Sequence, residues 1–234
     1  LAAEFTCSAT SILGPYARNF YVSPEAVYVW VNDWNSYAYV YRMPLDEDGA
    51  AQTLRADGSP IDQFSFKEQS GFLNVLVRSE GLGEAMWQPE TTTGKMALLR
   101  MPLSDFKGSA TLIGQDRYTA LPSPSGYGVQ NRYVGKYLLY GSGGPWWRGD
   151  KHPAQETLYA KKFASLEPTQ AIPVPHSIER IEVMGNGGIA IGSDGEKSLG
   201  FSSLNLGDAV SVSDTYLLPA ASQGELRSHG YFFK

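Results

Sequence analysis

Four kinds of strand-like segment follow one another along this chain, and the series recurs four times. The recurrence is clearest in the tetrapeptide "RMPL", which occurs at Arg42–Leu45 and again at Arg100–Leu103. Each copy follows an apolar run and precedes an acidic turn. A recurrence of roughly 40 to 60 residues indicates structural units stacked in tandem.

Each unit is predicted to contain four short strands. The first kind, with alternating polar and apolar residues, comprises Ile61–Glu68, Val129–Gly135, Ser177–Gly185 and Glu225–Phe233. The second kind, which is nearly all apolar, comprises Ala26–Val31, Phe72–Val77, Tyr137–Gly141 and Gly188–Gly192. The third kind comprises Tyr37–Leu45, Lys95–Leu103, Glu156–Phe163 and Ser198–Leu206. The fourth and weakest kind comprises Ala50–Leu54, Ala110–Gly114, Thr169–Val174 and Ala209–Leu218.

Little of the chain is left for helices of normal length, so the sequence predicts an all-β protein. Tandem four-stranded antiparallel units form a β-propeller, because each sheet has two apolar faces and must pack against its neighbours around an axis. We expect a β-propeller of four-stranded antiparallel blades, with about four blades' worth of strands in this chain. The alternative is a β-sandwich with a chance repeat, and the recurrence of all four strand kinds favours the propeller.

The order of the strands also predicts the domain organisation. In propellers related to WD-type repeats the innermost strand comes first, so we expect the "IDQF" kind of strand beside the axis. Residues 1–20 are then an N-terminal extension or linker, and residues 21–234 form the propeller. Complete blades are expected at 59–115, 128–175 and 177–218. Residues 26–58 lack an inner strand and residues 224–234 supply one, so these partial units either close a four-bladed ring or end a larger one.

Charge and composition narrow the kinds of partner. The net charge is −5 and the chain has no basic cluster, which argues against a nucleic-acid backbone as a partner. No apolar run approaches the roughly 18–20 residues of a membrane-spanning helix. Cys7 is the only cysteine, so no internal disulfide can form. Because the sequence starts at Leu1 and not at Met, we expect a processed chain or a fragment of a longer one.

Four stretches resemble a family of secreted prokaryotic proteins whose C-terminal β-propeller is distantly related to WD-type repeats. They are "YVSPEAVYV", "IDQFSFKEQSGFLNVLV", "IERIEVMGNGGIAIG" and "QGELRSHGYFF". The resemblance runs in the same order from about Tyr21 to Lys234. It implies a secreted or cell-surface location and a propeller of more than four blades, with other parts of the same polypeptide or complex as neighbours. It implies no activity, since the members of this family are largely uncharacterised.

The candidate binding residues are aromatic and lie in loops. Tryptophans occupy the connection between the second and third strands of three units, and two tyrosines lie within the long "DRYTALPSPSGYG" connection between blades (Asp116–Gly128). In an up-and-down blade all connections of one kind emerge on one face, and long loops on a rigid scaffold often carry binding residues. The candidate binding residues are Trp34, Trp87, Trp146, Trp147, Tyr118 and Tyr127.

The sequence shows no residue pair whose spacing demands catalysis. There is no G-x-S-x-G nucleophile motif, and the histidines lack the spacing of a zinc site. We predict no cofactor. Polar residues of the predicted inner strands are nevertheless candidates to line a central channel, and these are Asp62, Asn131, Arg132, Glu179, Arg180, Arg227 and His229. Asp46 and Asp48 are the only calcium candidates, and a turn is the favoured interpretation of "DEDG" because spaced oxygen ligands are missing.

Three functional hypotheses follow. The leading one is an extracellular or cell-surface scaffold that binds a protein, peptide or glycan through the loop-rich aromatic face. The second is a propeller enzyme, of hydrolase or lyase type, with a polar site in the central channel, although fold alone is weak evidence for an activity. The third is a structural component of a surface assembly.

Overall fold

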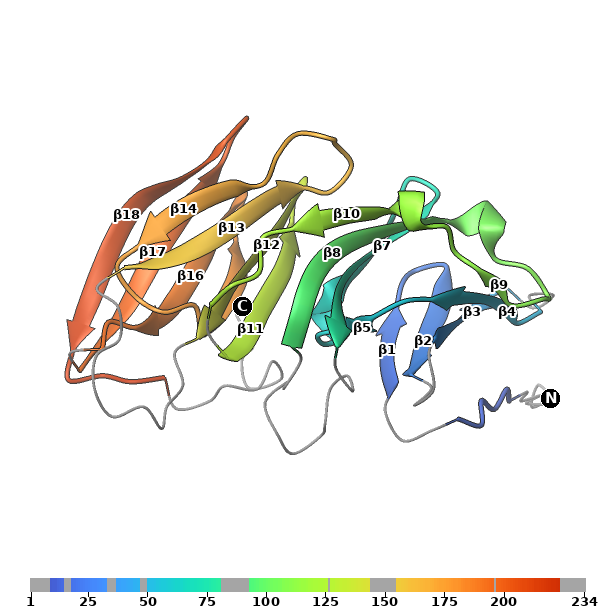
Figure 1. The fold of residues 1–234 in the computed structure, drawn as a ribbon. Coiled ribbons are helices and arrows are strands. Elements are labelled where there is room, and N and C mark those ends of the chain that lie inside the picture. The colour runs from blue at the N-terminus through green and yellow to red at the C-terminus, as the bar shows by residue number, and fades with distance from the viewer. Residues whose placement is uncertain are drawn as a thin grey trace, which may run out of the picture.

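The computed structural model describes residues 9–14, 18–32, 37–46, 50–80, 93–125, 127–143, 155–195 and 197–223. These residues form four sheets that follow one another in a curved row (Figure 1), which confirms the predicted all-β class and its antiparallel units. The described residues contain short 3-10 turns but no α-helix. They form no closed ring, because the first and last sheets lie at opposite ends of the row in Figure 1.

The first two sheets have five strands each. Sheet I contains β1 (Arg18–Val22), β2 (Ala26–Asn32), β3 (Ala38–Pro44), β4 (Gln52–Ala56) and, at its far edge, β9 (Thr111–Leu112). Sheet II contains β5 (Ser59–Pro60), β6 (Phe66–Gln69), β7 (Phe72–Glu80), β8 (Thr93–Pro102) and β10 (Tyr118–Leu121). The 3-10 turns in this half are η1 (Gln63–Ser65), η2 (Leu103–Asp105) and η3 (Gln115–Arg117).

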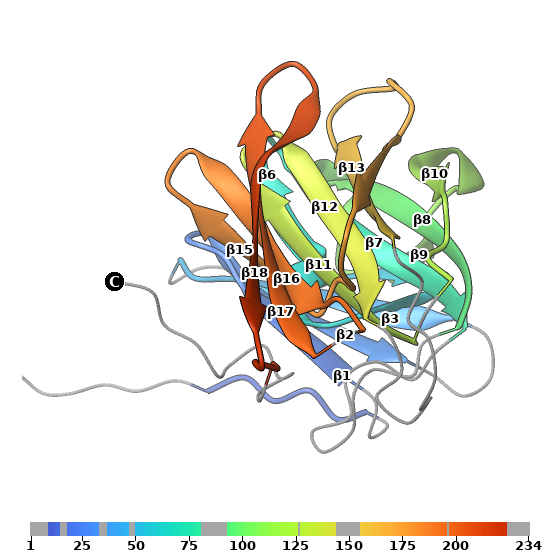
Figure 2. The same cartoon turned by 90° about the vertical axis from the view of Figure 1, so that its left-hand side faces the viewer.

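The last two sheets are simple four-stranded meanders. Sheet III contains β11 (Tyr127–Val134), β12 (Tyr137–Gly143), β13 (Glu156–Lys162) and β14 (Gln170–Val174). Sheet IV contains β15 (Arg180–Met184), β16 (Gly187–Ser193), β17 (Ser198–Leu206) and β18 (Val210–Pro219). Figure 2 shows β16, β17 and β18 in front of the other sheets.

A tight hairpin joins the first strand to the second in sheets II, III and IV. In sheet II the turn residues Ser70 and Gly71 both have positive φ, 51° and 77°, which is the conformation of a two-residue hairpin whose twist matches the strands. Gly135 and Gly185 open the equivalent turns with φ of 55° and 58°. The recurrence of this turn explains why a glycine follows the first strand in three successive units.

The sheets stack face to face, with one apolar core between each neighbouring pair. Between sheets I and II lie buried side chains such as Tyr28, Trp30 and Val75. Between sheets II and III lie Leu76, Leu98 and Tyr140, and between sheets III and IV lie Leu139, Ala190 and Leu204. Neighbouring residues of one strand, such as Val75 and Leu76, therefore serve different cores, because side chains alternate between the two faces of a sheet. Central strands with two buried faces read as continuous apolar runs, which is the pattern seen in "FLNVLV".

The first strands of the four sheets lie next to one another along one edge of the stack, which we call the inner edge. Contacts join β1 to η1, η1 to β11, and β11 to β15. The segment predicted as one inner strand, Ile61–Glu68, lies on this edge, but it consists of η1 and β6 preceded by β5. Asp62 breaks the strand because its side chain accepts a hydrogen bond from the Phe64 amide at 2.8 Å and caps the 3-10 turn.

The N-terminal part of the propeller prediction needs correction. Strand β1 begins at Arg18, inside the stretch expected to be an extension or linker, and pairs with β2 along its whole length. Sheet I therefore has its own first strand, and residues 26–58 do not lack one. Since β3 occupies the other edge of β2, Ala26–Val31 has no free edge for Glu225–Phe233. The latter segment lies outside the described residues.

The end of the second unit also differs from the prediction. Ala110–Gly114 was expected to be the fourth strand of its own blade, but β9 pairs in parallel with β4 of sheet I. The fourth strand of sheet II is β10, within a segment expected to be a loop, and it pairs with β8. The physical reason is the burial of Phe106 and Ile113 in the core between sheets I and II, which draws the chain across to sheet I before it returns.

Candidate functional site

The inner edge brings together most of the polar residues predicted to line a central channel. Asp62 lies in the segment before η1, Asn131 and Arg132 lie on β11, and Arg180 begins β15 with Glu179 just before it. These elements are consecutive along the inner edge, so the five residues lie at one edge of the stack, while the channel that they were predicted to line stays a prediction. Arg227 and His229 lie outside the described residues.

Asp62 and Asn131 form a buried polar pair between sheets II and III. Asp62 is 2% exposed, and its Oδ1 accepts a hydrogen bond from Asn131 Nδ2 at 3.1 Å. The same oxygen accepts the Phe64 amide and lies 3.4 Å from Ser65 Oγ, which donates to it. A buried carboxylate with these donors positions the turn and ties two sheets together. It is not presented to a substrate in solution.

Arg132 is held between sheets III and IV. Its Nη2 lies 2.7 Å from Glu182 Oε2, and its Nε donates to the Ile181 carbonyl at 3.2 Å. The guanidinium also lies 3.6 Å from the centre of the Phe64 ring, which adds a cation–π contact. With three kinds of contact the side chain has a fixed orientation, and it links β11, β15 and η1.

Arg180 and Glu179 are likewise engaged. Arg180 is 5% exposed, and its Nε lies 3.9 Å from Glu182 Oε1. Glu179 Oε1 accepts hydrogen bonds from Ser177 Oγ at 2.7 Å and from the Ser193 amide at 3.1 Å. Sequence reasoning missed Glu182, although its place two residues after Arg180 on a strand puts both side chains on one face.

A shallow depression lies beside these residues, between β1, η1, β6 and β11. Its walls are mostly aromatic and aliphatic, and two cationic side chains stand among them. The lining residues are Phe20, Tyr21, Val22, Gln63, Phe64, Phe66, Lys67, Arg132 and Tyr133. Phe20 and Val22 are 59% and 57% exposed, which is high for large apolar side chains.

Tyr133 is the one residue of this depression with an unmet polar group. The described residues offer its buried hydroxyl no hydrogen-bond partner. Burial raises the pKa of the Tyr133 phenol well above its ordinary value. The hydroxyl is therefore neutral at physiological pH, and most of the depression is aromatic surface.

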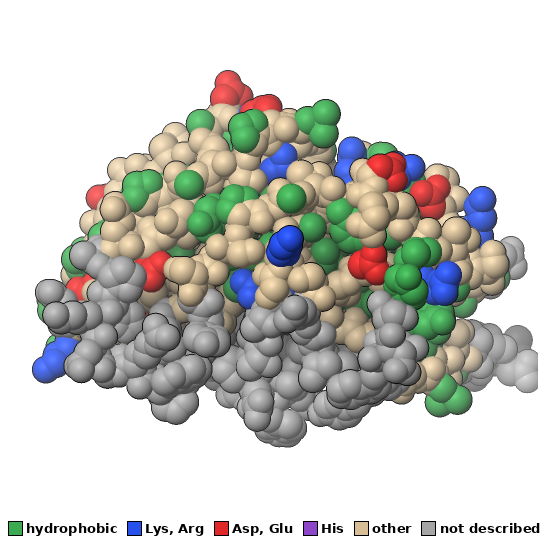
Figure 3. All heavy atoms as spheres, in the orientation of Figure 1, with side chains coloured by type: hydrophobic (Ala, Val, Ile, Leu, Met, Phe, Trp, Pro, Cys, Tyr) green, Lys and Arg blue, Asp and Glu red, His purple; other side chains and the backbone are tan. Residues whose placement is uncertain are grey.

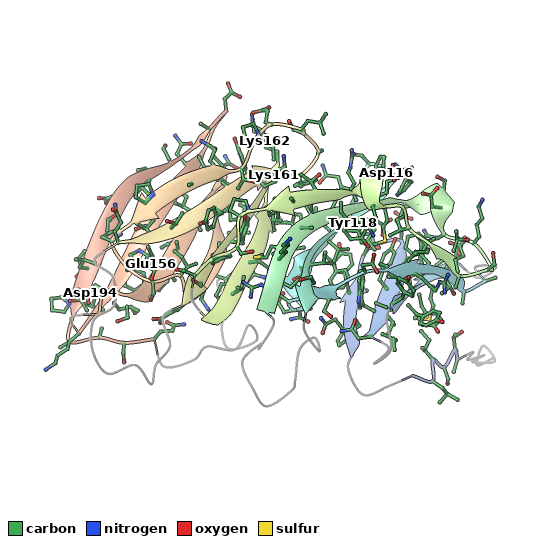
Figure 4. All side chains as sticks on the ribbon, viewed as in Figure 1. Asp116, Tyr118, Glu156, Lys161, Lys162 and Asp194 are labelled. Atoms are coloured by element: carbon green, nitrogen blue, oxygen red, sulfur yellow. The ribbon has the colours of Figure 1, made fainter. Side chains whose placement is uncertain are left out.

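Two buried titratable residues elsewhere serve the fold. Lys161 is 2% exposed, and its ammonium donates to the carbonyl oxygens of Ser165, at 2.8 Å, and Glu167. Figure 4 shows Lys161 beside Lys162 at the end of β13, at this turn. His176 is buried between the Ser177 carbonyl and the Ser202 hydroxyl, each 2.8 Å from a ring nitrogen. Burial lowers the pKa of each of these two side chains.

The predicted aromatic binding residues are only partly described. Tyr118, labelled in Figure 4, is half-buried on β10, and its hydroxyl accepts a hydrogen bond from the Asp57 amide at 2.8 Å. Burial raises the pKa of Tyr118 to about 12. This hydrogen bond ties sheet II to the turn after β4, and the predicted binding role of Tyr118 stays a prediction. Trp34, Trp87, Trp146 and Trp147 lie outside the described residues, as does the side chain of Tyr127.

The calcium prediction gains nothing from the structure. Asp46 is exposed, and Asp48 lies outside the described residues. Within the described ranges no three acidic, histidine or cysteine side chains come together in a way that would hold a metal ion.

In the same ranges, no helix has the length and apolar character needed to cross a membrane. On the face seen in Figure 3, basic and acidic side chains are interspersed with hydrophobic ones.

No protein-family model matches the sequence, and no curated protein matches it either.

Proposed function

We propose that the chain is an extracellular or cell-surface scaffold of β-propeller blades that binds a protein, peptide or glycan partner through its loop-rich aromatic face. The face-to-face stacking of four meandering sheets supports the propeller part of this proposal, because blades pack in this way. The shared inner edge, where first strands lie side by side, supports it further.

The binding part of this proposal rests on one observation: equivalent strands of the four sheets run in the same direction through the stack. The connections from the fourth strand of one sheet to the first strand of the next are short, at 57–58, 122–126 and 175–179. Each first strand therefore starts on the side of the stack where the previous fourth strand ends. It follows that the second strands end and the third strands begin on that same side of the stack. In the sequence, the four tryptophans at 34, 87, 146 and 147 stand between these strand ends.

The state of the inner edge favours binding over catalysis. The polar side chains described there are engaged in contacts within the protein, whereas the exposed side chains beside them, Phe20 and Val22, are apolar. Exposed aromatic and aliphatic surface on a rigid framework suits the anchoring of a partner. A propeller enzyme with a polar channel site remains the competing hypothesis, and a structural component of a surface assembly remains the third.

The experiment that tests this function replaces two tryptophans of one loop. The unmodified chain is screened on a glycan microarray and against a phage-displayed peptide library, and its hits are measured with a Trp146→Ala/Trp147→Ala variant. If these rings are anchors, the variant loses about 2 kcal/mol or more of binding free energy, roughly 30-fold in affinity, and keeps its melting temperature.

The control variant is Leu166→Ala. Leu166 is 97% exposed in the turn between β13 and β14, on the opposite side of the stack, so its removal should leave binding unchanged. Unchanged affinity of the tryptophan variant for every hit would contradict the proposal. Unfolding of that variant would show that the rings belong to the core.

A further inference from the structure

The depression between β1, η1, β6 and β11, which we call the aromatic depression, combines aromatic walls with two cations. Its volume is about 450 Å³, which falls within the range of pockets that hold small organic molecules. Its charged side chains, Lys67 and Arg132, come from sheets II and III, and both of these sheets pack against a neighbour on each face. The charge of the depression is therefore set by the middle of the stack and not by its ends.

The aromatic walls are held in place by contacts within the protein. Tyr21 and Phe66 stack with their ring centroids 5.7 Å apart and their planes 6° apart. Tyr133 meets the Phe163 ring edge-on at 5.3 Å, and it contributes its ring to the wall because its hydroxyl is buried. Binding of a ligand therefore requires little ordering of the walls.

Both cations of the aromatic depression have hydrogen-bond donors to offer. Lys67 is half-buried, and its ammonium forms no hydrogen bond or ion pair with the described residues. Arg132 uses Nε for the Ile181 carbonyl and Nη2 for Glu182, whereas its Nη1 has no partner in the described part of the chain. The Arg132 side chain is 16% exposed, so it is not closed off from solvent.

The carboxylate that follows Lys67 in the sequence is engaged elsewhere. Glu68 is the next residue of β6, so its side chain points to the other face of sheet II. There it accepts hydrogen bonds from Ser23 Oγ at 2.5 Å and from the Tyr28 hydroxyl at 2.9 Å. Glu68 therefore does not neutralise Lys67 inside the depression.

The carboxylate beside Arg132 is shared. Glu182 lies 2.7 Å from Arg132 Nη2 and 3.9 Å from Arg180 Nε, so one negative charge serves two guanidinium groups. Together with Lys67, this leaves the aromatic depression positively charged.

We propose that the aromatic depression binds a small organic carboxylate whose remaining part is an apolar ring or short chain. The carboxylate lies between the Lys67 ammonium and Arg132 Nη1, and the apolar part covers the aromatic wall. Because Glu182 offsets part of the charge of Arg132, the depression suits a single negative charge, and hydrogen bonds from cations to a carboxylate are stronger than those between neutral groups.

This site is separate from the loop-rich face. Lys67 and Tyr133 lie close to the ends of β6 and β11, beside the hairpin turns at Ser70–Gly71 and Gly135. The loop-rich face lies on the side where the first strands start. The two sites can therefore be tested independently of each other.

A titration of the ¹⁵N-labelled chain with 3-phenylpropanoate, followed by the shifts of backbone amide signals in NMR spectra, tests the proposal. We expect the amides of Lys67 and Tyr133 to shift, with a dissociation constant on the order of 1 mM, as is usual for a ligand of this size. The alcohol 3-phenylpropan-1-ol has the same apolar part without the charge, and it should bind at least about fivefold more weakly.

Lys67→Gln removes the charge and keeps most of the length of the side chain. It should weaken binding of 3-phenylpropanoate about fivefold or more, leave binding of the alcohol unchanged, and preserve the melting temperature. Lys95→Gln is the matched control, because Lys95 is exposed on β8 of the same sheet and does not line the depression. This control and the Trp146→Ala/Trp147→Ala variant should both bind 3-phenylpropanoate as the unmodified chain does.

Three results would overturn the proposal. They are equal affinity of the unmodified chain for the acid and the alcohol, undiminished binding of the acid by Lys67→Gln, and amide shifts confined to parts of the chain outside η1, β6 and β11. Absence of any shift at several times the expected dissociation constant would overturn it too.

Discussion

Replacing Gly200 by alanine should destabilise the protein through one specific clash. Gly200 lies on β17, on the face of sheet IV that packs against sheet III. A Cβ atom added there would lie 2.4 Å from His176 Cδ2 and 2.8 Å from His176 Cβ, well inside van der Waals contact. The ring has no easy escape, because both of its nitrogens are hydrogen-bonded, to the Ser177 carbonyl and the Ser202 hydroxyl.

The size of the effect follows from opposing contributions. Forcing an extra methyl group into a packed core costs about 1–3 kcal/mol. Displacing the His176 ring would add about 1 kcal/mol for a lost hydrogen bond. Replacing a flexible glycine by alanine returns about 0.4–1 kcal/mol, because the unfolded chain loses freedom. The net loss of unfolding free energy for Gly200→Ala is therefore about 1–3 kcal/mol.

Gly188→Ala is the matched control on the same face of the same sheet. Its added Cβ would meet its nearest neighbour, the Glu182 carbonyl oxygen, at 3.4 Å, and Leu139 Cδ1 at 3.5 Å, which are ordinary contacts. We expect this variant to be neutral or stabilised by up to about 1 kcal/mol.

Urea unfolding followed by circular dichroism measures both variants. Gly200→Ala should lower the midpoint without changing the slope, and in a chain of this size each kcal/mol should lower Tm by about 2–4 °C. Equal stability of the Gly200→Ala variant and the unmodified chain would refute the packing assigned to sheets III and IV. Equal losses of unfolding free energy in Gly200→Ala and Gly188→Ala would also refute that packing.

Two further predictions concern buried polar groups. Because burial lowers the pKa of His176 from its ordinary value of 6.5, the unfolded chain binds more protons just below that pH, and stability should fall as the pH drops from 6.5 towards the folded pKa. His176→Gln should flatten this part of the stability curve in urea titrations at successive pH values, and an unaltered curve would contradict the assignment. Asp62→Ala should cost about 1–2 kcal/mol, because it removes the cap of η1 and the acceptor for Asn131. Asn131→Ala should lower the free energy of unfolding, measured in urea, by less in the Asp62→Ala variant than in the unmodified chain. Full additivity of the two losses would show that the two side chains do not interact.

The fold class could be predicted because the periodic signal is strong. Runs such as "FLNVLV" and "GIAIG" are strands β7 and β16, and the glycine turns before them recur at equivalent positions. The first strand of sheet I was missed because Arg18–Val22 is short and is not followed by a glycine turn. Its signal lay in Ser23, whose hydroxyl accepts the amides of Glu25 and Ala26 and closes the hairpin in place of a glycine.

The exchange of β9 and β10 could not be predicted from local pattern. "ATLIG" and "YTAL" are equally short, and only the burial of Phe106 and Ile113 between sheets I and II decides which one stays with sheet II. The candidate site could likewise be predicted only in part. Alternation on the first strands placed Asn131 and Arg132 on the inner edge, but their partners Asp62 and Glu182 come from neighbouring sheets and depend on the stacking.

A crystal structure of the chain would test the central claim most directly. That claim is that the four sheets are propeller blades, stacked face to face with their first strands along one inner edge. We expect β1, η1, β11 and β15 to lie next to one another along that edge, and Asp62 and Asn131 to be buried between sheets II and III. A structure in which these elements lie at an outer edge, or in which Asp62 and Asn131 are open to solvent, would contradict the account.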